Sequence, residues 1–271
     1  MLPDAIRTDF HMPPASFALL FAAGAIAGLM NAIAGGGTIL TFPALIFAGI
    51  APIPANATST IALLPGIMAG VFGYRRNISA SSAWIRRFAL VSLVGGLLGS
   101  MLLVRTPPAV FDWLVPFLIL FATVLFTAHG FFAKLLRIEL DHRKSTPGLR
   151  WLIGAITFQF AVAVYGGYFG AGIGILMLAS LGMLGIGHIH EMNTVKSVLA
   201  FLINLIAALY FIASGLVHWP AAVAMSLGAM VGGYSGAHFA QKIPHRTVRH
   251  LITAIGLALA AIMFVKKIAH H

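Results

Sequence analysis

Long apolar stretches separated by short polar ones run along almost the whole of this 271-residue chain. A helix that crosses a bilayer needs about 20 predominantly apolar residues, because each residue rises 1.5 Å. The pattern therefore predicts an all-α integral membrane protein with about ten transmembrane helices. The expected segments are 15–33, 36–50, 55–74, 84–104, 109–133, 150–168, 170–187, 191–214, 217–239 and 247–268.

The composition excludes a water-soluble fold. Hydrophobic residues make up 60% of the chain and charged residues only 8%, whereas soluble domains carry roughly 25% charged residues. The mean hydropathy is +0.97. Cysteine is absent, which excludes disulfides and thiolate chemistry.

The basic residues set the expected orientation. Of the 17 lysines and arginines, 12 lie in the connections at 75–87, 134–150 and 242–249. With ten crossings these three connections share one side of the membrane, and the positive-inside rule makes that side the cytoplasm. This distribution explains the net charge of +11 without nucleic acid. We expect a multi-pass protein of the bacterial inner membrane with both termini extracytoplasmic.

Two glycine-rich breaks interrupt the apolar pattern, at 34–38 and at 166–174. Each precedes a short apolar segment, the second and the seventh. Backbone that is not helical persists in a membrane only where it is buried in protein or lines a cavity. Paired breaks in the two halves of a chain point to a transport site. The charge count favours a full crossing by the seventh segment over a re-entrant hairpin.

The breaks also suggest an internal repeat. At an offset of 136 residues, Gly36 aligns with Gly172 and Thr58 with Thr194. Five crossings per half is an odd number, so the second half must be inverted relative to the first. The predicted organisation is a first inverted repeat at 1–133, a cytoplasmic linker at 134–149, a second inverted repeat at 150–269 and a purification-tag remnant at 270–271.

A glycine loop that opens a helix suits an anion, because its free N–H groups and the helix dipole attract negative charge. Polar residues near the breaks would add donors, although the same residue types also serve as helix N-caps. An intramembrane lysine is a functional candidate, with Glu191 as its expected partner. The substrate-binding candidates are Asn31, Gly35, Gly36, Gly37, Thr38, Asn56, Thr58, Tyr168, Gly170, Gly172, Ile173, Asn193, Thr194 and Lys196.

These residues resemble a known family. The runs 28–43 and 55–59 are similar to the first-half signature of the sulfite exporter TauE/SafE family, and the runs 168–174 and 193–194 resemble its second repeat. Ile173 stands where the fuller glycine run has a glycine. The resemblance implies a permease or exporter for a small sulfur-containing anion such as sulfite, sulfoacetate or another organosulfonate.

The expected mechanism is alternating access, with the anion bound near the bilayer middle where the two short helices begin. One repeat would rock against the other. We expect no enzymatic activity, no metal and no cofactor. The pattern leaves the particular anion, the direction of transport, the coupling ion and the oligomeric state open.

Other functions are compatible with parts of the pattern. A ten-helix metabolite transporter of another family would share the repeat, and a passive anion channel would share the anion site. An intramembrane serine protease is a remote alternative, based on the run 233–236, although His238 lies too close in sequence to the serine to be well placed as its base. His188 and His190 alone are a weak metal signal, because no third ligand accompanies them.

Overall fold

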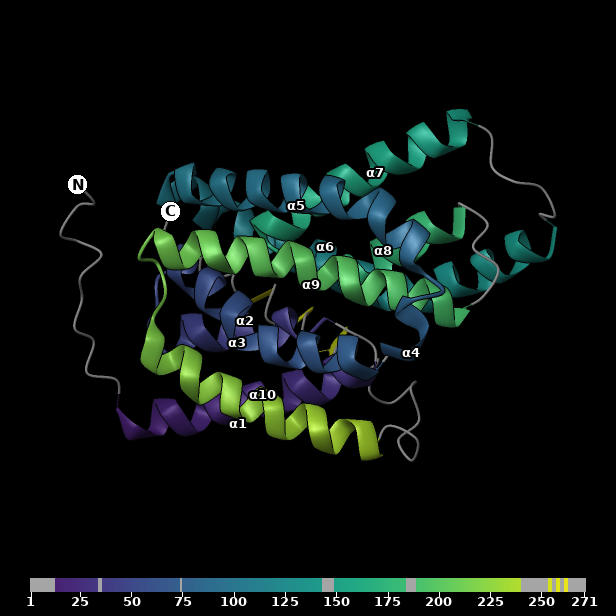
Figure 1. Ribbon diagram of the computed structural model, residues 1–271. Coiled ribbons are helices and arrows are strands. Elements are labelled where there is room, and N and C mark those ends of the chain that lie inside the picture. The colour runs from purple at the N-terminus through teal and green to yellow at the C-terminus, as the bar shows by residue number, and fades with distance from the viewer. Residues whose placement is uncertain are drawn as a thin grey trace.

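The computed structural model describes residues 13–33, 36–73, 75–142, 149–183 and 189–239, together with the short stretches 253–254, 257–258 and 261–262. Every regular element in these ranges is a helix (Figure 1). The helices are α1 (Pro14–Ile33), α2 (Thr38–Phe47), α3 (Pro52–Gly73), α4 (Arg75–Ile78), α5 (Ser82–Arg105), α6 (Pro108–His142), α7 (Leu149–Tyr168), α8 (Ile173–Met183), α9 (Ile189–Ala213) and α10 (Trp219–Phe239).

The helices follow the apolar pattern of the sequence. Nine of the ten expected segments coincide with a helix. The tenth segment and the C-terminal histidines lie mainly outside the described residues. By length and hydropathy, five described helices are able to cross a membrane, namely α1, α3, α5, α6 and α9. The protein is therefore an all-α, multi-pass membrane protein, and the full count of ten crossings stays a prediction.

The structure departs from the expected helices at α6 and at α4. Helix α6 continues to His142, through most of the stretch expected to be a polar linker. That stretch contains good helix formers and lacks proline and glycine until Pro147, so its polarity does not end the helix. The short helix α4 was not expected, and it occupies the basic connection before α5.

Helices α1 and α10 form the most extensive pair in the described part of the chain, and their backbones touch. A methyl group added at Gly232 would collide with the carbonyl oxygen of Ala25. Small residues permit such close approach between membrane helices, where packing rather than the hydrophobic effect drives association. The glycines at this contact are spaced four apart in each helix: Gly24, Gly28, Gly228 and Gly232.

Helices α5 and α7 form the second close pair in the same way. A methyl group at Gly99 would collide with the carbonyl oxygen of Val164, and one at Gly167 with that of Gly96. In each pair, the first apolar helix of one half of the chain packs on the fourth apolar helix of the other half. Helices α3 and α9 also contact each other, between the two pairs.

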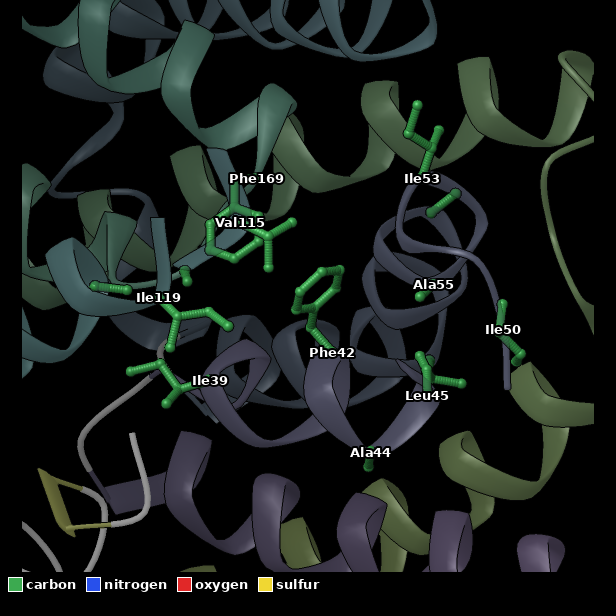
Figure 2. Close-up of a cluster of buried hydrophobic side chains, with 14 of the residues drawn as sticks. Ile39, Phe42, Ala44, Leu45, Ile50, Ile53, Ala55, Val115, Ile119 and Phe169 are labelled. Atoms are coloured by element: carbon green, nitrogen blue, oxygen red, sulfur yellow. The ribbon is translucent and has the colours of Figure 1, made fainter. Parts of the chain in front are cut away.

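A buried cluster of hydrophobic side chains surrounds α2. In Figure 2, Phe42 points from α2 toward Phe169 of the second break and Val115 of α6. The rings of Phe42 and Phe169 meet edge to face, with centroids 5.3 Å apart, which is a favourable aromatic geometry. Phe111 of α6 completes the group, 6.4 Å from Phe42. The core therefore joins the short helix of the first half to the break of the second.

The glycine contacts predict a position-specific response to alanine. We expect Gly232→Ala to destabilise the protein by about 1–3 kcal/mol, because the methyl group has no room beside the α1 backbone. Gly154→Ala is the control, since a methyl group there meets nothing within 4 Å. It should be neutral or stabilising by about 0.5–1 kcal/mol. Thermal unfolding in detergent measures both, and equal responses would contradict the packing argument.

Candidate functional site

The first break is capped by a side chain. Helix α1 ends at Ile33, and Gly36 has a left-handed backbone conformation, with φ of +91°, just before α2 begins. The N–H of Gly37 donates to Oδ1 of Asn31 over 2.8 Å. Asn31 therefore caps the N-terminus of α2. Gly35 lies outside the described residues.

The second break lacks such a cap. Gly170 and Gly172 have φ of +78° and +77°, which turns the chain from the end of α7 into α8. Among the described residues, no acceptor meets the N–H groups of Ile173 and Gly174. At the offset of 136 residues, the position of Asn31 is taken by Gly167, which has no side chain. The first turn of α8 thus keeps free donors.

Tyr165 and Tyr168 shape this break but do not supply it with free hydroxyl donors. The hydroxyl of Tyr165 donates to the carbonyl oxygen of Ala171 over 2.8 Å and so holds the loop. The Tyr168 hydroxyl lies 3.4 Å from Oγ1 of Thr106, in the connection between α5 and α6. Its ring packs on Phe111, with centroids 5.7 Å apart.

Lys196 lies beside the first turn of α8. The Cδ atom of Lys196 is 3.5 Å from where a methyl group at Gly174 would stand. Its ammonium group donates to Oδ1 of Asn193 over 3.1 Å, so the contact found is with Asn193 instead of the expected Glu191. The side chain is only partly exposed. The cationic side chain of Lys196 therefore packs against the first turn of α8, where the free N–H groups lie.

The polar residues of α3 and α9 do not cap their own helices. Helix α3 begins at Pro52, before Asn56 and Thr58, and α9 begins at Ile189, before Asn193 and Thr194. Asn56 instead donates from Nδ2 to the carbonyl oxygen of Tyr168 over 2.9 Å. Thr58 accepts from the N–H of His218, at the start of α10, over 3.0 Å. Thr194, its partner in the alignment, is fully buried in α9.

The two breaks are close in space. Ile39, one residue into α2, shares a buried cluster with Phe169, Ala171 and Ile175 around the second break. Phe42 and Phe169 were not among the expected site residues. Phe169 stands directly before Gly170 and Phe42 lies five residues after Gly37, but an aromatic residue in an apolar helix ordinarily serves packing. A buried aromatic cluster therefore joins α2 to the second break, at the end of α7 that precedes the free donors of α8.

The rival sites gain no support from this geometry. Ser235 lies within α10, beside the largely exposed Tyr234. In the described ranges, no three His, Asp or Glu side chains come together to hold a metal ion. His188 lies outside those ranges.

Comparison with known proteins decides the family. The model of the sulfite exporter TauE/SafE family matches residues 20–263. The chain belongs to this family. No solved structure matches it.

Its relatives in the TauE/SafE family are described as transporters. A probable membrane transporter protein, ORF9, of Sinorhizobium sp. is 29% identical over 93% of this chain and 92% of its own length. A probable membrane transporter protein of Haemophilus influenzae is 27% identical over 91% and 93%. The probable membrane transporter protein YfcA of Escherichia coli is 26% identical over 95% and 93%. The chain is thus a membrane transporter and not an enzyme, and a transporter acts on a small-molecule substrate.

Proposed function

We propose that this TauE/SafE protein is a permease that moves a small sulfur-containing anion, such as sulfite, sulfoacetate or another organosulfonate, across the bacterial inner membrane. The anion would bind at the N-terminus of α8, deep in the membrane. The observation that carries this proposal is the pair of free N–H groups at Ile173 and Gly174 next to Lys196.

Electrostatics favours an oxyanion at this point. The N-terminus of a helix carries a partial positive charge of roughly half an elementary charge, and Lys196 adds a full one. Water-poor surroundings strengthen both attractions. A sulfonate group has three oxygens, enough to accept from two backbone N–H groups and the ammonium group together. The chain has only six acidic residues, so few carboxylates compete for the cation.

The first break plays a different part in this proposal. Because Asn31 already accepts from Gly37, α2 offers fewer free donors than α8. Gly36, Gly37 and Thr38 would then line the site, while α8 binds the anion. Thr58 and Thr194 would fix the neighbouring helices. The binding set expected from the sequence is thereby divided into an anion-binding group and a supporting group.

The glycine-packed helix pairs support alternating access in which each pair moves as a unit. If the halves are inverted repeats, each glycine-packed pair, α1–α10 and α5–α7, combines one helix from each repeat. The first repeat then cannot rock as a unit against the second without separating backbones that touch. We infer that the two pairs move relative to each other, about the central helices α3 and α9.

Lys196→Met tests the binding site. A hydrogen bond to a charged group contributes about 1.5–3 kcal/mol, so we expect the affinity for methanesulfonate to fall about 10- to 100-fold. Methionine keeps the apolar stem beside Gly174, and thermal stability should change little. Arg105→Met, at the end of α5, is the matched control and should leave affinity unchanged. Titration calorimetry on purified protein measures both, and unaltered binding by Lys196→Met would refute the site.

Spin labels test the moving bodies, and the absence of native cysteine makes labelling specific. Cysteines at Leu19 of α1, Leu227 of α10 and Leu98 of α5 are all on exposed positions. We expect the 19–227 distance to stay constant on adding methanesulfonate, while the 19–98 distance shifts by several Å, roughly as in hinge or rocking transitions. A change within the 19–227 pair as large as that between pairs would contradict this mechanism.

A further inference from the structure

One buried acceptor beside the second break has no donor. Asn56 is 1% exposed, and its Nδ2 donates to the carbonyl oxygen of Tyr168 over 2.9 Å. A carbonyl oxygen only accepts, so this contact fixes the orientation of the amide. Within the described part of the chain, Oδ1 of Asn56 then meets no hydrogen-bond partner. Leaving such a buried group unsatisfied is unfavourable, so a partner is expected.

The position of this acceptor relates it to the free donors of α8. Asn56 bonds to Tyr168, the residue from which the chain leaves α7 and turns through Gly170 and Gly172 into α8. Among the described residues, the N–H groups of Ile173 and Gly174 lack an acceptor, and the amide oxygen of Asn56, whose Nδ2 bonds to the same break, lacks a donor. An anion with acceptor oxygens alone would accept from the N–H groups of Ile173 and Gly174 but would leave Oδ1 of Asn56 without a donor.

Other buried polar atoms without partners do not share this position. Gln159 donates to Ser92 within the α5–α7 pair, away from the break, although its Oε1 is unpaired. The hydroxyl groups of Ser81 and Ser180 rotate freely, so neither has a fixed unmet acceptor. Asn56 alone among these unpaired atoms combines a fixed amide orientation with a bond to the break.

We propose that the ligand is an oxyanion that also carries a hydrogen-bond donor, and that Oδ1 of Asn56 accepts from that donor. The donor is an O–H group, either the proton of hydrogensulfite or a hydroxyl on the carbon chain of a sulfonate. This inference rests on the proposed function, because it adds a specificity residue to the same site. It also lets a substrate bring its own proton, in a chain with few acidic residues.

A matched pair of ligands tests the inference on the wild-type protein. 2-Hydroxyethanesulfonate and propane-1-sulfonate have the same charge and similar size but differ by a hydroxyl in place of a methyl group. We expect calorimetry to give at least a tenfold lower Kd for the hydroxylated ligand. A second arm titrates sulfite on either side of its second ionisation, and the monoprotonated form should bind more tightly if the donor is the O–H group of hydrogensulfite.

Variants assign the preference to Asn56. Asn56→Leu should bind 2-hydroxyethanesulfonate and propane-1-sulfonate equally, and its retained binding of propane-1-sulfonate shows that the site is intact. Asn56→Ala replaces it if the leucine variant does not fold. Asn204→Leu is the control, because the Asn204 amide donates within its own helix, to Ala200. That variant should keep the wild-type preference.

The outcomes separate this inference from the proposed function. If the wild type binds both sulfonates equally and sulfite equally in both forms, a water molecule fills the acceptor and the inference is wrong, while the anion permease stands. A preference that survives Asn56→Leu also overturns it. If the wild type binds neither sulfonate nor sulfite, the proposed function itself fails.

Discussion

One constraint governs this structure: backbone polar groups away from water must find partners. Lipid offers none, so a break in a membrane helix must be satisfied by protein or by a ligand. At the first break, Asn31 meets the N–H of Gly37. At the second break, the aligned position is Gly167, and the N–H groups of Ile173 and Gly174 meet no acceptor in the described part of the chain. This difference is what directs the proposed anion to α8.

Glycines within the helices, which lack side chains, allow the helices to pack closely. Glycines at a spacing of four bring the backbones of α1 and α10 into contact, and Gly99 and Gly167 do the same for α5 and α7. Interior packing of this kind is resistant to gradual deformation. Movement is then expected at softer contacts, between the pairs. The glycines thus serve two separate purposes. Those at the breaks shape the site, and those within helices hold together the pairs α1–α10 and α5–α7, which we expect to move as units.

The sequence predicted the helices well, because length and hydropathy are local properties. It also predicted that the two breaks converge on one site, which stays a prediction, although Phe42 of α2 does contact Phe169 of the second break. It did not predict the partners of polar side chains. Asn56 resembled a helix cap, yet it reaches Tyr168, which is 112 residues away in the chain. Such contacts depend on how helices cross, which no local pattern encodes. Hydropathy likewise could not foresee α6 continuing to His142, since a polar stretch of helix formers stays helical.

Anion binding at α8 is best measured through the chemical shifts of individual backbone amides in protein labelled with ¹⁵N-isoleucine. No acceptor in the described ranges meets the N–H of Ile173, whereas the N–H of Ile39, near the start of α2, already donates to the carbonyl oxygen of Gly36 over 3.0 Å. Titration with 2-hydroxyethanesulfonate should move the Ile173 resonance in a saturable way and leave Ile39 much less affected. A saturable shift at Ile39 with none at Ile173 would contradict anion binding at α8.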